Sequence, residues 1–142
     1  MNDNIVIFDL MAASLFQTLY EAFPKCETVI PERIVKELGK DLDRFEISFD
    51  EKTTILSETL FWLGANGFIS FAYPKERPEI PTSITQFDCV ELTLKGLSLM
   101  KSPLPRTVAT GRTTGDEIID KFKSGLVSEA GRIAAKAILS FA

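Results

Sequence analysis

The spacing of apolar residues near the C-terminus is the feature that most constrains the fold. They recur at intervals of three and four positions, and they are Ile119, Phe122, Leu126, Ala130, Ile133, Ala137 and Phe141. This is the period of an α-helix that buries one face. Thr114 and Glu117 have the spacing of a capping box. The pattern therefore predicts one amphipathic helix over residues 114–142, whose apolar face must be covered by another surface.

Helical periodicity also marks three segments in the first half of the chain. One helix is predicted from Ile5 to the Phe23-Pro24 pair, and a short one from Pro31 to Gly39. A third is predicted to follow Asp50 as its N-cap and to end around residues 64–67. Residues 27–30, between the first two helices, predict a short strand.

A β-hairpin is predicted next, because residues 68–73 and 87–92 both read as strands. The segment between them is rich in proline, which cannot donate to a strand ladder, and is expected to project as a loop. Thr93 can cap a short helix that follows. Residues 103–113 have the composition of a linker, which divides the chain into a body of residues 1–102, this linker, and the C-terminal helix of residues 114–142.

The order helix, strand, helix, helix and two-stranded hairpin is that of a winged helix, and two motifs carry the resemblance. The segment Leu60-Phe61-Trp62-Leu63-Gly64-Ala65-Asn66-Gly67-Phe68-Ile69 resembles the L-x-x-L-x-x-x-G-F-I exit of winged-helix domains. The segment Val90-Glu91-Leu92-Thr93-Leu94-Lys95-Gly96 resembles their V-x-L-T-x-K-G ending. Residues 1–102 as a whole also resemble small uncharacterised bacterial winged-helix proteins that finish with a separate amphipathic helix.

This resemblance implies an α+β, mainly helical fold. It would consist of a winged helix, with three helices and a β-hairpin wing, and an extra C-terminal amphipathic helix. Domains of this kind bind DNA, RNA or proteins, so the resemblance implies a fold more firmly than a function.

The residue types argue against catalysis. The chain contains no histidine, which removes the commonest general base and the usual nitrogen ligand of zinc. Cys26 and Cys89 form no Cys-x-x-Cys spacing and are predicted to be buried thiols. No glycine-rich phosphate loop is present. We therefore expect a protein that is not an enzyme, with no catalytic residue, no metal and no cofactor.

Hydropathy and the N-terminus bear on location. Uninterrupted apolar stretches such as Ile5 to Phe8 fall far short of the ~20 residues that a membrane span needs. The N-terminal residues before Ile5 include no basic residue, unlike a secretory signal. These observations predict a cytoplasmic protein with no membrane span.

The charge distribution favours a protein partner over a nucleic acid. Residues 1–102 carry 10 basic and 16 acidic side chains, whereas residues 103–142 carry 6 and 4. An acidic body repels phosphate backbones, and the predicted third helix lacks the arginines that read base edges. The leading hypothesis is therefore a non-catalytic protein-interaction module, acting as a regulator, an adaptor or a toxin-neutralising immunity protein.

The alternative hypothesis is a DNA-binding transcriptional regulator. Five basic residues would then supply phosphate contacts, and they are Lys52, Lys75, Arg77, Arg106 and Arg112.

Two groups of residues are candidates for partner binding. Phe61 and Trp62 point about 100° apart on a helix, so one of them can lie outside the core and anchor an interface. The second group is the C-terminal apolar stripe, through Ile119, Phe122, Leu126, Ile133 and Phe141. That stripe predicts either self-association or docking onto the chain's own first helix.

Overall fold

The structure is a computed structural model that describes residues 3–79, 84–103 and 111–141. It has an α+β, mostly helical fold, as the sequence predicts. The elements in chain order are α1 (Asp3–Ala22), β1 (Glu27–Val29), α2 (Pro31–Leu38), α3 (Lys40–Asp43), α4 (Phe49–Ala65), β2 (Ile69–Ser70), β3 (Phe87–Leu92), α5 (Leu94–Lys101), α6 (Thr114–Lys123) and α7 (Val127–Phe141).

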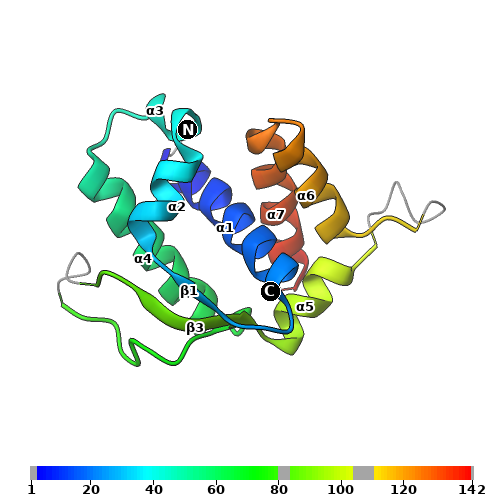
Figure 1. The fold of residues 1–142 in the computed structure, drawn as a ribbon. Helices are drawn as coiled ribbons and strands as arrows, with labels where there is room; N and C mark the ends of the chain where they lie inside the picture. Colours follow the sequence, from blue (N-terminus) through cyan, green and yellow to red (C-terminus); the bar gives the residue numbers. More distant parts are fainter. Residues whose placement is uncertain (1–2, 80–83, 104–110, 142) are drawn as a thin grey trace.

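Helix α1 lies at the centre of the molecule. Figure 1 shows α2 and α4 on one side of α1, α6 and α7 on the other, and the strands across one end. The side chains of Ile7, Met11, Leu15 and Phe16 are completely buried. Among the described residues, α1 is the one helix long and apolar enough to cross a membrane, but half of it is buried in the fold. Its packing on both sides accounts for its apolar composition.

The three strands form an antiparallel sheet in the order β1-β3-β2. The predicted strand over residues 87–92 is confirmed, but its predicted partner over 68–73 is much shorter. After Ser70 the pairing continues only as an isolated bridge between Tyr73 and Asp88. Pro74 follows at once and has no N–H to donate, which explains why the ladder ends there.

The two motifs that carry the winged-helix resemblance contact each other. The Thr93 hydroxyl donates to the Gly67 carbonyl, and the Lys95 ammonium donates to the Asn66 carbonyl at 3.0 Å. The Gly96 Cα lies directly against the Phe68 carbonyl oxygen, where a Cβ would overlap it. Thr93 is also the N-cap of α5, as predicted, because its hydroxyl accepts from the Gly96 N–H at 3.1 Å. The turn after α4 and the start of α5 thus form one unit.

One helix boundary and one additional helix differ from the prediction. Helix α4 begins at Phe49, because Ser48 rather than Asp50 is the N-cap and its hydroxyl accepts from the Glu51 N–H at 3.1 Å. A polar segment between the second and third predicted helices contains the short helix α3.

The predicted single helix over 114–142 is wrong, because two helices occupy this region. The chain turns at Gly125, whose φ of +76° lies in the left-handed region that glycine adopts readily. The capping box is also displaced by one residue: Thr113 and Asp116 exchange hydrogen bonds of 3.1 and 3.0 Å between side chain and backbone.

Helices α6 and α7 fold back onto α1 of the same chain. Gly131 of α7 faces the backbone of Asp9 and the side chain of Leu10, so the two helices approach closely. The buried apolar residues of α6 and α7 are Ile118, Val127, Ala130, Ala134, Ala137 and Ile138. Of the two arrangements that the stripe predicted, docking onto the first helix is therefore the one observed.

The predicted linker falls mostly outside the described residues, which include neither 104–110 nor its Arg106. Its two ends lie side by side. Pro103 and Thr113 form an isolated bridge, and the Thr114 N–H donates to the Ser102 carbonyl at 2.8 Å. The start of α6 is thereby fixed to the end of α5.

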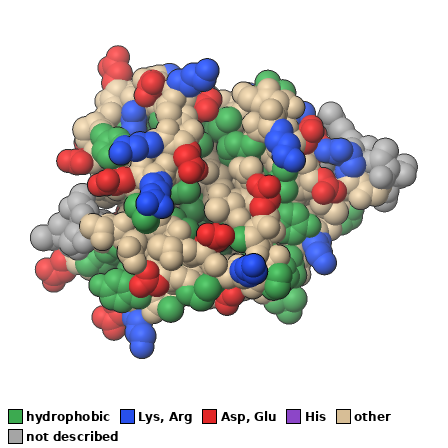
Figure 2. Space-filling view, viewed as in Figure 1, with side chains coloured by type: hydrophobic (Ala, Val, Ile, Leu, Met, Phe, Trp, Pro, Cys, Tyr) green, Lys and Arg blue, Asp and Glu red, His purple; other side chains and the backbone are tan. Residues whose placement is uncertain are grey.

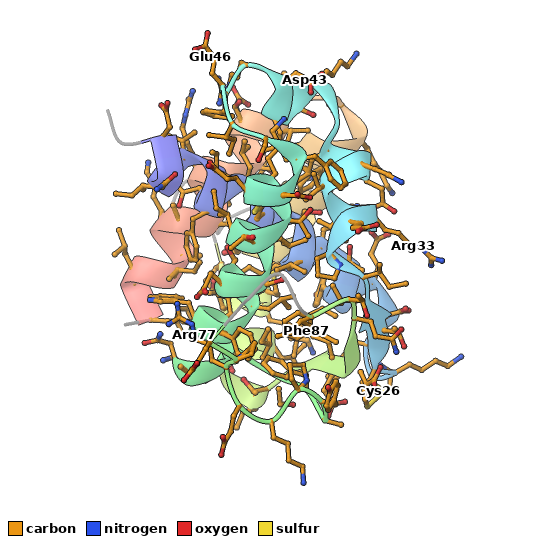
Figure 3. All side chains as sticks on the ribbon, turned by 90° about the vertical axis from the view of Figure 1, so that its left-hand side faces the viewer. Cys26, Arg33, Asp43, Glu46, Arg77 and Phe87 are labelled. Carbon is orange, nitrogen blue, oxygen red and sulfur yellow. A yellow bond between two sulfur atoms is a disulfide. The ribbon has the colours of Figure 1, made fainter. Side chains whose placement is uncertain are left out.

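The prediction that the two cysteines are buried thiols is wrong. Cys26 and Cys89 are both exposed, and they form a disulfide with their Cα atoms 4.7 Å apart. Figure 3 shows Cys26 near the sheet. The bond joins the residue before β1 to the middle of β3. The sequence alone does not show that these two strands are neighbours.

Candidate functional site

An open groove lies between α1, α4 and the chain that follows β2. Its volume is about 1080 Å³. Its floor is apolar and consists chiefly of Phe8, Ile55, Phe61, Trp62, Ile69 and Phe71. Polar side chains line its rim, and they are Asn4, Glu58, Ser70, Lys75 and Arg77. An apolar groove with a few polar groups at its edge is the usual form of a binding site.

Trp62 is packed on one side and open on the other. Its ring stands edge-on to Phe8 of α1, with centroids 5.3 Å apart, and stacks over Phe68 at 6.4 Å. The residue is nevertheless 43% exposed. Trp62 is therefore held in place by aromatic neighbours while presenting a large apolar face to the groove.

Phe61 lies on the neighbouring face of α4 and is half-buried. It packs against Phe71 and Phe87, with ring centroids 5.8 and 5.3 Å away. Gly64 leaves room for the Phe71 ring, which a Cβ at that position would approach to 3.1 Å. Phe61 thus holds the sheet against α4 and forms part of the groove floor.

The charged rim comes from α4 and from the segment after β2. Figure 3 shows Arg77 beside α4. Its Nε donates to Glu58 Oε1 at 3.2 Å, and its Nη2 lies 2.5 Å from Glu58 Oε2. This paired geometry ties the segment to the helix. Lys75 is exposed and takes part in none of the ion pairs seen in the described part of the chain.

The groove brings together residues that the sequence placed in two separate groups. Phe61 and Trp62 are candidates for partner binding, and Lys75 and Arg77 are candidates for phosphate contact, yet all four line one surface. Sequence reasoning missed Phe8, which comes from the opposite end of the body. Its three-residue spacing from Ile5 identified it only as one apolar position of the first helix.

The other two described basic candidates, Lys52 and Arg112, do not line this groove. The Lys52 side chain is 12% exposed and lies 3.8 Å from Asp43. Arg112 is paired with Glu117 at 3.0 Å. On the face drawn in Figure 2, basic and acidic side chains are interspersed rather than gathered by sign. The phosphate-contacting set is therefore not assembled among the described residues.

The C-terminal candidates lie mainly against the chain's own core. Ile119, Ile133 and Phe141 are half-buried, and Phe122 lines a small cavity of about 270 Å³ between α1, α2 and α6. Only Leu126, at the turn between α6 and α7, is largely exposed, at 45%. No continuous apolar stripe of these five residues is left for a second chain.

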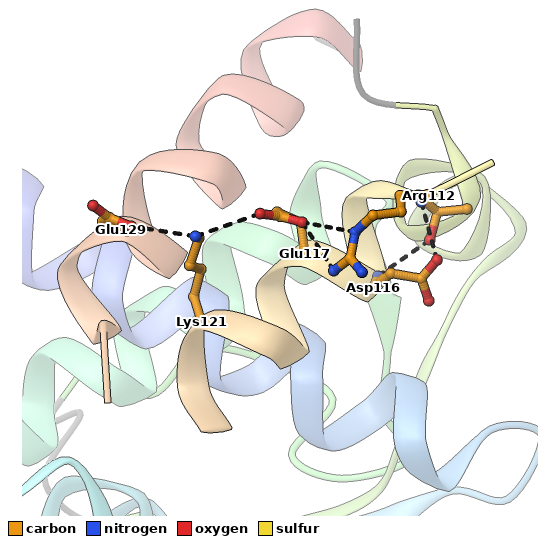
Figure 4. A network of polar contacts seen from close by, with 6 residues as sticks. Arg112, Asp116, Glu117, Lys121 and Glu129 are labelled. Carbon is orange, nitrogen blue, oxygen red and sulfur yellow. Dashed lines mark hydrogen bonds and ion pairs between the residues drawn. The ribbon is translucent and has the colours of Figure 1, made fainter. Parts of the chain in front are cut away.

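A polar network fixes α6 to α7 (Figure 4). The Lys121 ammonium lies 3.5 Å from both Glu117 of α6 and Glu129 of α7. Glu117 in turn accepts from Arg112 at the start of α6. The network supports the view that the C-terminal helices belong to the fold of this chain.

The described residues contain no group of three or more His, Cys, Asp or Glu side chains placed to hold a metal ion. Burial raises the pKa of the Asp9 carboxyl. Asp9 lies in α1, but it is not among the residues that line the groove. The groove lining presents both apolar and charged side chains to an occupant.

Comparisons with protein-family models, with curated proteins and with solved structures find no match for this chain.

Proposed function

We propose that the chain is a non-catalytic winged-helix module that binds a protein partner through the groove on α1 and α4. The two contacting motifs support the winged-helix assignment, as does the element order of α1, β1, α2, α4, β2 and β3. In this assignment the segment between β2 and β3, which carries Lys75 and Arg77, is the wing. A regulator, an adaptor or an immunity protein would each use such a module.

The observation that carries the proposal is the exposure of Trp62 on the floor of the groove. Tryptophan is enriched among the residues that contribute most to protein interfaces. A rigid ring, already held by Phe8 and Phe68, loses little conformational freedom when a partner covers it. The surrounding floor extends the apolar surface well beyond one side chain, which favours a protein segment as the occupant.

DNA binding is the second candidate, because Lys75 and Arg77 occupy the proposed wing. The acidic body, the largely covered side chain of Lys52 and the ion pair of Arg112 weigh against it. A single-stranded nucleic acid could also stack its bases on the aromatic floor.

The test compares three forms of the full chain as bait in an extract of its native cells. They are wild type, Trp62→Ala and a control, Leu139→Ala, which removes an even more exposed apolar side chain from α7. We expect one protein to be captured in stoichiometric amount by wild type and by the control, and to be lost with Trp62→Ala. Circular dichroism should show that all three forms are folded.

Two results would contradict the proposal. One is capture that is unchanged by Trp62→Ala, which would place the interface elsewhere. The other is a gel-shift titration on mixed-sequence duplex that gives sub-micromolar binding with a steep dependence on salt, because that would make DNA the main ligand.

A further inference from the structure

The charged side chains that line the groove add up to a net positive charge. Its charged lining residues are Glu58, Lys75 and Arg77. Glu58 is already engaged by both nitrogens of the Arg77 fork. The charge left to face an occupant is that of Lys75, although the chain as a whole has a net charge of −4.

The position of this charge relative to the apolar floor defines what can bind. Lys75 comes from the segment after β2, whereas Trp62 and Phe8 come from α4 and α1, and all three line the same groove. The ion pair between Arg77 and Glu58 fixes that segment to α4, two residues beyond Lys75. An occupant that rests on the aromatic rings therefore shares the groove with the Lys75 side chain.

We infer that the groove takes a partner segment in which an aromatic or long aliphatic side chain lies next to an aspartate or glutamate. The apolar side chain would rest on Trp62 and Phe8, and the carboxylate would pair with Lys75. This inference rests on the proposed function and adds the chemistry of the partner. Charge complementarity of this kind selects among partners more than it adds affinity. The apolar floor alone would accept many apolar side chains, so the charge of Lys75 would provide the selectivity.

Two small probes with the same apolar part and opposite charges test this chemistry. They are 4-phenylbutyrate and 4-phenylbutylamine, titrated at millimolar concentrations into the ¹⁵N-labelled full chain while the indole N–H signal of Trp62 is followed. Trp62 is the only tryptophan, so its indole signal is unambiguous. We expect the carboxylate to bind about two- to fivefold more tightly than the amine, the range of an exposed ion pair.

The variant Lys75→Glu should reverse this preference. Lys136→Glu, which makes the same change of charge at an exposed position of α7, should preserve it. Equal binding of both probes to wild type, or a preference that Lys75→Glu does not alter, would overturn the inference and leave the proposed function standing.

A different pair of results would count against the groove itself. If neither probe shifts the Trp62 signal, or if Trp62→Ala leaves unchanged the shifts that both probes cause in backbone amide signals, the groove is not the binding surface, and the proposed function fails with the inference. If a single-stranded oligonucleotide shifts the Trp62 signal at lower concentration than 4-phenylbutyrate, the occupant is a nucleic acid and the inference is wrong.

Discussion

Gly96 lies against the backbone carbonyl of Phe68, in a space too small for any side chain. A Cβ at position 96 would overlap the Phe68 oxygen and also come within 3.1 Å of the Leu92 side chain. This contact places α5 directly on the turn that follows α4. It gives a physical reason for glycine in the V-x-L-T-x-K-G motif.

Gly96→Ala should therefore destabilise the fold although alanine normally favours a helix. Overpacking of this kind costs typically 1–3 kcal/mol, and the neighbour here is backbone, which cannot rotate away. We expect the free energy of unfolding in urea to fall by at least about 2 kcal/mol. Ser98→Ala is the comparison, because it places alanine at an exposed position of the same helix. Equal losses in the two variants would show that the contact is not the cause.

The secondary structure follows from the sequence wherever the signals are local. Pro31, the Thr93 cap and the alternation over residues 87–92 each mark an element that the structure confirms. The break between α6 and α7 was missed because Gly125 falls inside an apolar spacing that continues across it. As a result, the prediction placed Ile119 rather than Ile118 on the buried face.

Only part of the candidate site could be predicted from the sequence, because some of its residues come together only through tertiary packing. Phe61 and Trp62 stand out because two adjacent large aromatics cannot share one face of a helix. Phe8 is distant in sequence, and so is the Glu58 partner of Arg77, so their positions depend on tertiary packing. The disulfide depends in the same way on the pairing of β1 with β3.

The disulfide should contribute substantially to stability. It links residues with a sequence separation of 63, and closing a loop of that length in the unfolded chain corresponds to about 4 kcal/mol in the chain-entropy model. We expect the double variant Cys26→Ser, Cys89→Ser to lose about 2–4 kcal/mol in urea denaturation. Wild type in the presence of dithiothreitol should behave in the same way. Unchanged stability in both cases would show that the cysteines are unpaired in solution.

The same bond bears on the cytoplasmic location, which stays a prediction. Disulfides persist in oxidising compartments and are rare in the cytosol. Alkylating the free thiols of the protein in intact cells, before extraction, shows whether Cys26 and Cys89 are paired or free in the compartment where the protein resides. Two labelled cysteines per chain would support a reducing cytoplasm. Two protected ones would contradict the predicted location.

Asp9 should make the fold less stable as the pH rises. Burial raises the pKa of this carboxyl above its ordinary value of 3.8, so the folded state favours the protonated form. The stability that the protonated Asp9 carboxyl gives the folded state is fully present below the pKa of the unfolded state. It is lost as the pH rises through the pKa of the folded state. We expect Asp9→Asn to unfold at a higher temperature than wild type at pH 7 and to show no such advantage at pH 3. A lower melting temperature at pH 7 would contradict this.

Helices α6 and α7 should be necessary for the fold of the body. They cover one side of α1, and a chain ending at Thr113 would expose buried side chains such as Leu10, which lies against Gly131 of α7. Because the apolar face is covered within one chain, we expect light scattering to give a monomer for the full chain. The shortened chain should aggregate or melt at a much lower temperature. An equally stable and soluble shortened chain would show that the two helices are not structural.

The central claim is that a protein occupies the groove beside Trp62, and photo-cross-linking in native cells tests it most directly. Benzoylphenylalanine would replace Ser70, an exposed residue of the groove lining, or Leu139 on α7 as the control. We predict a single cross-linked protein from position 70, absent from position 139, whose cross-linked peptide contains an acidic residue next to an apolar one. Cross-links from position 70 to nucleic acid alone, or none at all from a folded variant, would contradict the account.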